Sequence, residues 1–139
     1  MRVLAIETTG EVKSIALAED RTLIGEISFS GNLLTEFWPR LDAFLRENRK
    51  AIKDIDLFAA CNGPGSWTGL RFGLAVVKGW AVVIGKEVSV RSFPELTATA
   101  LPAHTLAAAL ACQCFLGQRP EEIAVNYGHL PKFRTLASN

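Results

Sequence analysis

The first thirty residues alternate between apolar runs and short polar turns. Residues 2–7 read RVLAIE, which is typical of a strand buried on both faces. Residues 13–20 and 22–30 follow after tight turns, and each has the alternation of a half-buried strand. Sequential strands joined by short turns predict an antiparallel meander at the start of the chain.

The apolar spacing then changes to a helical period. Phe37, Leu41 and Phe44 fall on one face of a helix, with charged residues on the other. Pro39 suits a first helical turn, so this helix is expected to begin between residues 35 and 38.

The rest of the chain alternates strands and helices. Ser92 and Glu95 have the spacing of a capping box and predict a helix start. The remaining predicted elements are a buried strand at 53–61, a helix at 68–84, a strand at 86–92, an Ala-rich helical run at 101–115 and an irregular tail from 119. This order predicts an α/β fold with a mixed sheet.

Composition narrows the class of protein. The chain has 139 residues, 49% apolar and 21% charged, which predicts one globular domain. A formal net charge of +1 gives no electrostatic case for a dedicated nucleic-acid binder. Lys78 and glycines interrupt the apolar runs, so we expect no membrane span. Three cysteines without framework spacing favour a reduced, cytoplasmic setting.

The stretch CNGPGSWTGLR, residues 61–71, raises the question of phosphate binding. Gly69 is followed by leucine where a Walker loop needs lysine, and the glycine spacing misses the dinucleotide pattern. Backbone amides at the helix start could still hold an anion. The alternative is a strand-to-helix turn, stiffened by proline and capped by serine or threonine. The residues concerned are Gly63, Pro64, Gly65, Ser66, Thr68, Gly69 and Arg71.

The helix predicted at 68–84 is apolar on nearly all sides. One side can pack on the sheet, and the other needs a partner in so small a chain. Gly69 and Gly73, and likewise Ala75 and Gly79, would let another backbone approach closely. A partner interface is the preferred interpretation, and a central core helix of a monomer is the alternative.

The sequence offers little catalytic chemistry. His104 and His129 form no paired-histidine metal motif, so no metal site is expected. Cys112 and Cys114 point to different faces of a helix and are interpreted as packed apolar residues. No nucleophile with an adjacent base is evident, which argues against a peptidase.

Two long segments resemble the TsaB (YeaZ) family, which takes part in making threonylcarbamoyladenosine on tRNA. They are MRVLAIETTGEVKSIALAED at the start and DLFAACNGPGSWTGLRFGLAVVKGWA, and the run GPGSWTGLRFG is highly specific. LAAALACQCFLGQRPEEI and LPKFR resemble the end of the family's chains. The resemblance implies a single lobe of the actin-like and ribonuclease-H-like fold.

The chain departs from the family in two places. Residues 1–100 correspond to the N-terminal lobe, and residues 101–139 to the last helix and tail packing on it. Between them a second lobe of roughly 60 to 80 residues is expected to be deleted. Members also carry a histidine before the first long helix, and NLLTEFWPRL contains none.

The resemblance implies a non-catalytic scaffold that activates a TsaD-like threonylcarbamoyl transferase in t6A modification of tRNA. It implies that the transferase is the partner and that a TsaE-like ATPase is a further candidate partner. It also implies that the chain forms a homodimer in isolation, needs no cofactor and makes no direct contact with tRNA. The expected interface residues are Phe37, Leu41, Leu45, Phe72, Val76, Gly79 and Val83.

Two alternatives stay open. One is a small ATP-binding enzyme of the actin-like kinase type, in which Glu7, Thr8 and Thr9 would form the nucleotide site. Glu7 stands where such kinases have an aspartate that helps hold hydrated Mg²⁺, and its other interpretation is a turn anchor. The second alternative is a homodimer that has lost the pathway role.

Overall fold

The structure is a computed structural model that describes residues 1–114 and 116–123. Its centre is a five-stranded sheet of order β3-β2-β1-β4-β5. The strands are β1 (Arg2–Glu7), β2 (Lys13–Glu19), β3 (Thr22–Phe29), β4 (Leu57–Cys61) and β5 (Glu87–Arg91). β1, β2 and β3 pair antiparallel, whereas β1–β4 and β4–β5 pair parallel. The predicted meander and the mixed sheet are both confirmed.

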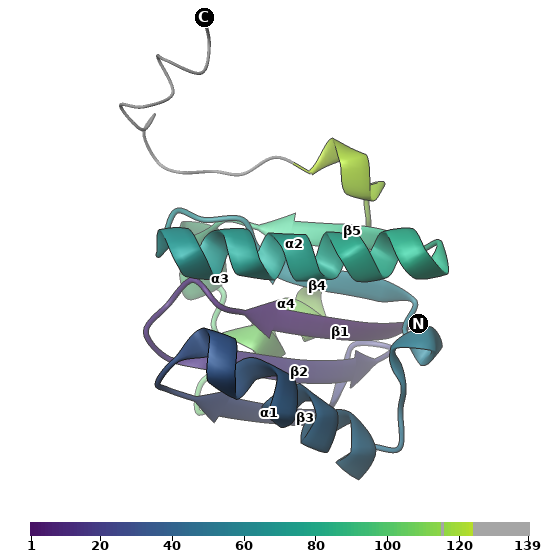
Figure 1. Ribbon diagram of the computed structural model, residues 1–139, viewed down its shortest axis with the longest axis horizontal. Helices are drawn as coiled ribbons and strands as arrows, with labels where there is room; N and C mark the ends of the chain where they lie inside the picture. Colours follow the sequence, from purple (N-terminus) through teal and green to yellow (C-terminus); the bar gives the residue numbers. More distant parts are fainter. Residues whose placement is uncertain (115, 124–139) are drawn as a thin grey trace, which may run out of the picture.

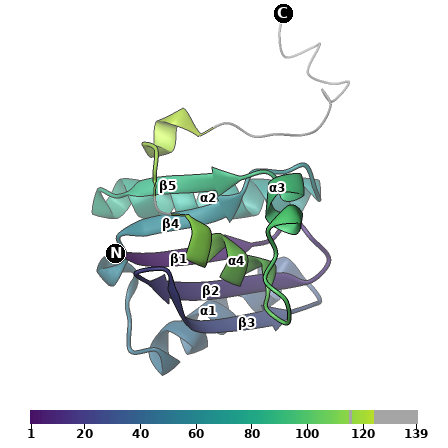
Figure 2. The same cartoon turned by 180° about the vertical axis from the view of Figure 1, so that it is seen from behind.

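Helices cover both faces of the sheet. α1 (Leu33–Glu47) and α2 (Trp67–Ile84) lie on one face (Figure 1), and α3 (Phe93–Ala98) and α4 (Leu106–Gln113) lie on the other (Figure 2). Two short 3-10 turns, η1 (Ile52–Asp54) and η2 (Pro120–Glu122), complete the described elements. Each sheet face buries its own apolar cluster, the first under α1 and α2 and the second under α4.

α1 begins earlier than the position of Pro39 predicts. The Asn32 side chain accepts hydrogen bonds from the backbone amides of Leu34 at 2.9 Å and Thr35 at 3.3 Å, and this cap sets the start at Leu33. Pro39 therefore lies in the helix interior and leaves the Thr35 carbonyl without its usual donor. Both residues are exposed, so water can reach that carbonyl.

α2 ends at Gly85, which adopts a left-handed conformation with φ of 70° and closes the last turn. Its 18 residues make it long and apolar enough to cross a membrane by length and composition alone, which corrects the expectation that no run suffices. In the fold one side of α2 packs on β4 and β5 as a core helix does.

α4 is shorter than the Ala-rich run suggested. Thr105 caps it, accepting a hydrogen bond from the Ala108 amide at 3.0 Å, so the helix starts at Leu106 instead of 101. Its buried alanines let it lie close to β1 and β2. Residues 120–122 of the predicted irregular tail form η2, and the LPKFR segment and His129 lie outside the described residues.

Candidate functional site

An apolar groove with a volume of about 520 Å³ runs between α1 and α2 on the outer side of these helices. In Figure 1 the two helices diverge along the sheet. Its lining residues are Trp38, Ile52, Phe72, Ala75, Val76, Gly79, Trp80, Val83 and Ile84. None of these described lining residues is charged, so they present an apolar surface.

Aromatic rings form the floor and the α1 wall of the groove. Phe37 and Phe72 meet edge to face with ring centroids 5.0 Å apart, and Trp38 and Trp80 do so at 6.4 Å. The Phe58 ring of β4 lies 5.3 Å from the Trp80 ring and joins the floor to the sheet. Edge-to-face packing at these distances is favourable, so the floor is held in place by the core beneath it.

Four of the seven predicted interface residues line the groove: Phe72, Val76, Gly79 and Val83. Leu45 is half-buried against the core. Phe37 and Leu41 are 0% and 5% exposed, so they support the surface from inside and do not present it. The expectation that these two contact a partner is corrected, because the stripe at their spacing is the side of α1 that faces the sheet.

The sequence interpretation missed Trp38, Ile52, Ala75, Trp80 and Ile84 as lining residues. Trp38 stands one position after a buried residue of α1, which turns it toward the cleft between α1 and α2. Ile52 comes from η1, whose position between α1 and β4 no helical period could indicate. The tryptophans next to the buried faces of α1 and α2 were the sequence feature that could have indicated this lining.

The pair Gly69 and Gly73 faces the chain's own backbone. A Cβ atom on Gly69 would overlap the Thr8 carbonyl oxygen, and one on Gly73 would overlap the Thr8 hydroxyl. Thr8 itself donates a hydrogen bond to the Gly69 carbonyl at 2.6 Å. The close approach expected for these glycines is therefore made by the turn after β1 and not by a partner. A Cβ atom on Gly79, in contrast, would have no neighbouring atom within 4 Å, so this glycine is open.

The glycine loop connects β4 to α2 through contacts with both neighbouring segments. The Ser66 hydroxyl caps α2 by accepting from the Gly69 amide at 3.4 Å, and the Ser66 amide donates to the Thr9 carbonyl at 3.1 Å. The Phe93 amide donates to the Gly63 carbonyl at 2.9 Å, which ties the loop to the start of α3. Of the two capping candidates, Ser66 is the cap and Thr68 is exposed.

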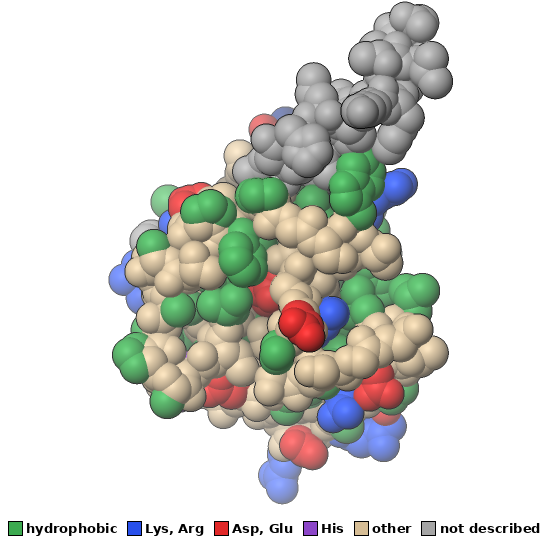
Figure 3. Space-filling view, turned by 90° about the vertical axis from the view of Figure 1, so that its left-hand side faces the viewer, with side chains coloured by type: hydrophobic (Ala, Val, Ile, Leu, Met, Phe, Trp, Pro, Cys, Tyr) green, Lys and Arg blue, Asp and Glu red, His purple; other side chains and the backbone are tan. Residues whose placement is uncertain are grey.

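The end of the molecule where α2 begins is viewed directly in Figure 3. Acidic and basic side chains are both scattered over this face, and the described residues drawn there form no basic patch. Arg71, the basic member of the loop set, is exposed on α2. Phosphate binding at the helix start thus has the helix amides in its favour but no gathered positive charge.

Glu7 lies at the end of β1 and is 0% exposed. Its Oε1 atom accepts hydrogen bonds from the Thr9 amide at 2.8 Å and from the Thr9 hydroxyl. The carboxylate thus holds the turn that packs on α2. Its Oε2 atom, like the Asn62 side-chain oxygen, is buried without a hydrogen-bond partner among the described residues.

Cys61 and Cys112 are poor nucleophiles. Burial raises the pKa of the Cys61 thiol, and the nearby Glu7 carboxylate raises it further. Burial also raises the pKa of Cys112. Both thiols therefore stay neutral near pH 7. Among residues 1–114 and 116–123, no three His, Cys, Asp or Glu side chains gather as a metal site would need.

A charged contact anchors the connection between α3 and α4 to the sheet. Glu26 on β3 accepts a hydrogen bond from the Thr105 amide at 2.7 Å and pairs with the His104 ring. Although burial alone would raise the pKa of Glu26, the hydrogen bonds from Thr105 and His104 lower it overall. His104 is therefore a paired residue at the start of α4.

A comparison with protein-family models shows to which family this chain belongs. A family model described as "TsaD: tRNA N6-adenosine threonylcarbamoyltransferase" matches residues 12–118. The chain belongs to this family. Within the family, the resemblance to TsaB proteins is confirmed by relatives in two comparisons.

Among its relatives, the chain is 34% identical over 83 residues to the tRNA threonylcarbamoyladenosine biosynthesis protein TsaB of Escherichia coli, covering 59% of this chain and 36% of that protein. It is 33% identical over 103 residues to the tRNA N6-adenosine threonylcarbamoyltransferase of Kosmotoga olearia, covering 62% of this chain and 31% of that protein.

The structure of YeaZ from Pseudomonas aeruginosa matches with a TM-score of 0.65 at 26% identity, over 70% of this chain and 46% of that one. This match and the mixed five-stranded sheet confirm the α/β, actin-like and ribonuclease-H-like lobe. The chain thus spans from about a third to about a half of the relatives' lengths.

Proposed function

We propose that this chain is a non-catalytic scaffold that binds and activates a TsaD-like threonylcarbamoyl transferase in t6A modification of tRNA, in the cytoplasm. The observation that carries the proposal is the open apolar groove between α1 and α2, in a member of the TsaD and TsaB family. The transferase contacts the tRNA, and a TsaE-like ATPase is a further partner of the assembly.

The groove has the character of a protein-protein interface. Val83 at its rim is 83% exposed and Trp38 is 47% exposed, so large apolar side chains face solvent in the lone chain. Covering such a surface is favourable by about 25 cal/mol for each Å² of apolar area removed from water. A concentrated apolar patch of this kind is typical of interaction sites. In isolation, two copies of the chain pair through the same face and exchange into the complex.

The buried chemistry supports a scaffold more than an enzyme. Glu7 is committed to the Thr9 amide and hydroxyl, and the Cys61 thiol is kept neutral by burial. Neither group is placed as an activated nucleophile with an adjacent base. The activity of the complex is accordingly assigned to the transferase.

A small ATP-binding enzyme is the second candidate, and one observation favours it. The Glu7 Oε2 atom at the end of β1 is buried without a hydrogen-bond partner among the described residues. Saturable nucleotide binding that requires Mg²⁺ and is lost in Glu7→Gln, measured by calorimetry, would support this candidate. A titration without heat at millimolar nucleotide would remove it.

The scaffold proposal is tested by light scattering and calorimetry on the chain alone and mixed with the transferase from the same cell. Val76→Asp and Val83→Asp should each weaken the complex by on the order of 100-fold, because each would bury an unpaired charge in the apolar contact with the partner. Val83→Asp serves as the safer variant for folding, since its side chain is already exposed.

Val12→Asp is the matched control, since Val12 is 56% exposed in the turn after β1 and away from the groove. It should leave the affinity unchanged, and circular dichroism should show all three variants folded. If Val76→Asp and Val83→Asp bind the transferase as tightly as the unaltered chain, the groove is not the interface. If the unaltered chain forms no complex, the scaffold function is wrong.

A further inference from the structure

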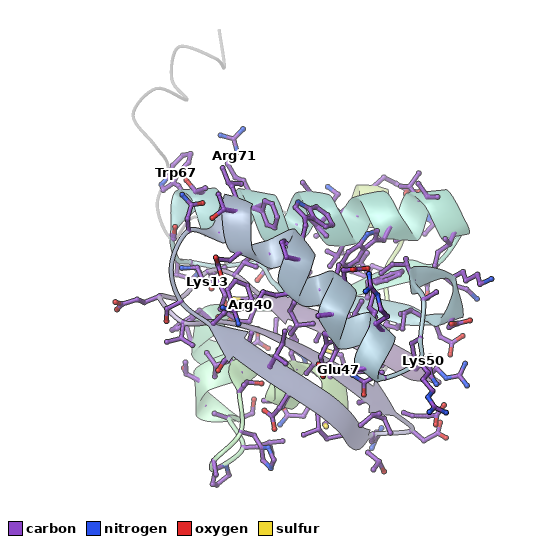
Figure 4. The ribbon with its side chains drawn as sticks, turned by 60° about the horizontal axis from the view of Figure 1, so that its bottom comes forward. Lys13, Arg40, Glu47, Lys50, Trp67 and Arg71 are labelled. Carbon is purple, nitrogen blue, oxygen red and sulfur yellow. The ribbon has the colours of Figure 1, made fainter. Side chains whose placement is uncertain are left out.

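α2 carries basic side chains and no acidic one. Arg71 and Lys78 are seven residues apart, close to two helical turns, so both lie along one stripe of the helix. Neither forms an ion pair within the part of the chain that the structure describes. In Figure 4 the Arg71 side chain projects outward from α2, away from α1. The exposed face of α2 is therefore bounded by unpaired positive charge.

The basic side chains of α1 and the arginine next to η2 are paired with carboxylates. The ion pairs of α1 and η2 are Arg40 with Glu36, Arg46 with Asp42, and Arg119 with Glu121 and Glu122. The two cations of α2 therefore differ from the arginines of α1, which already have carboxylate partners. A binding partner that supplies negative charge beside α2 would complement these two cations.

The positive stripe and the apolar groove lie on adjacent parts of the same helix surface. At 100° for each residue, Arg71 and Lys78 lie on one flank of the stripe formed by Ala75 and Gly79, and the groove lies on the other flank. A helix seated over Ala75 and Gly79 would thus place one edge in the groove and the other against the two cations. The absence of a side chain on Gly79 leaves room for a large apolar residue of that helix.

We propose that the segment bound here is an amphipathic helix of a different protein, with an apolar seam over Ala75 and Gly79 and acidic residues opposite Arg71 and Lys78. The inference rests on the proposed function and specifies the chemistry of the partner. A second copy of the chain fits less well, because its α2 brings two more cations and no carboxylate. Repulsion between the cations of the two copies disfavours the homodimer, so exchange should proceed from the homodimer to the heterocomplex.

Two synthetic helical peptides with the same leucine seam test the inference, one with glutamates along its flank and the other with lysines. At low salt the glutamate peptide should bind the unaltered chain at least about tenfold more tightly, and the difference should shrink as salt screens the charges. In the double variant Arg71→Glu and Lys78→Glu the preference should reverse. Equal affinities, or a preference for lysine, would overturn the inference.

Lys13→Glu with Lys50→Glu is the matched control, because it changes the net charge equally at positions that Figure 4 shows away from α2. It should retain the preference for the glutamate peptide. If both double variants lose the preference alike, the effect comes from net charge and the inference fails.

Titration of the same variants with the transferase separates this inference from the proposed function. A transferase that does not bind, together with a clear glutamate preference in the peptides, means that the function is wrong and the partner chemistry is right. If the transferase binds the chain and its charge-reversed variant equally, and the two peptides also bind equally, the proposed function is right and the partner chemistry is wrong.

Discussion

Helix α2 contains two pairs of small residues with the same spacing, and the fold uses them in opposite ways. Gly69 and Gly73 lie against Thr8, whose backbone and hydroxyl occupy the space where side chains would be. Ala75 and Gly79 face outward into the groove, and Gly79 has nothing near it. One pair closes the fold of the chain, and the other leaves a surface open.

The difference shows what a small-residue spacing can and cannot indicate. Residues four apart on a helix share a face, and small ones let another backbone come close. Which backbone comes close depends on where that face points. Gly69 and Gly73 share the buried side with Leu70 and Val77, whereas Gly79 lies on the opposite side.

The largest effect on stability should come from comparing two single variants, each of which adds one methyl group, on opposite sides of α2. Gly69→Ala should lower the free energy of unfolding by at least about 3 kcal/mol, because its Cβ would overlap the Thr8 backbone. Gly79→Ala is the matched control and should gain up to about 1 kcal/mol, since alanine favours a helix and the space is empty. Urea denaturation measures both.

Gly73→Ala keeps this comparison decisive if Gly69→Ala does not fold. Its Cβ would meet the Thr8 hydroxyl, a side-chain atom that can rotate, so we expect a smaller loss than at Gly69. Equal stabilities for Gly73→Ala and Gly79→Ala would show that the two faces do not differ as described.

A larger side chain at Gly79, in the open pair Ala75 and Gly79, should weaken binding of the partner without changing the stability of the fold. Gly79→Leu should weaken the complex with the transferase by about tenfold, because the leucine fills the space that the partner helix needs. Gly79→Ala should change the affinity less. Calorimetry measures both, and melting temperatures near that of the unaltered chain would show that folding is preserved. A leucine variant that binds as tightly would place the partner elsewhere.

On the other face of the sheet, a charged contact at the start of α4 adds to the close packing of its buried alanines. The pKa of Glu26 is lowered in the fold, so its contribution is present above its ordinary pKa of 4.5 and is lost as the pH falls through the folded value. Glu26→Gln should cost about 1 kcal/mol at pH 7 and less than that at pH 3. Denaturation at both pH values measures this, with Glu47→Gln as an exposed control; a cost that is the same at both pH values would contradict it.

The smallest effect is expected at the helix cap. Ser66→Ala should lower the free energy of unfolding by about 0.5 to 1 kcal/mol, because it removes the acceptor of the Gly69 amide. Thr68→Ala should change it by only a few tenths of a kcal/mol, since Thr68 is exposed inside the helix. The reverse order of the two losses would assign the cap to Thr68.

The sequence by itself determined the elements and their order. Apolar periodicity located β1, β2, β3 and α2, and the spacing of Ser92 and Glu95 located the start of α3, whose capping box the structure contains. These features are local, because a cap or a strand alternation depends on residues within one or two turns. The run GPGSWTGLRFG was specific enough to indicate the family.

Only the tertiary structure decided which faces meet. It placed Phe37 and Leu41 in the core, brought Ile52 into the groove, and turned Gly69 and Gly73 toward Thr8, which lies 61 residues from Gly69 in sequence. It also joined Glu26 to the start of α4, 79 residues away. Such contacts depend on how helices are rotated on the sheet, and many segments far apart in the chain fix that rotation jointly. A period identifies a face of a helix, but packing alone decides whether that face is covered by the chain or left for a partner.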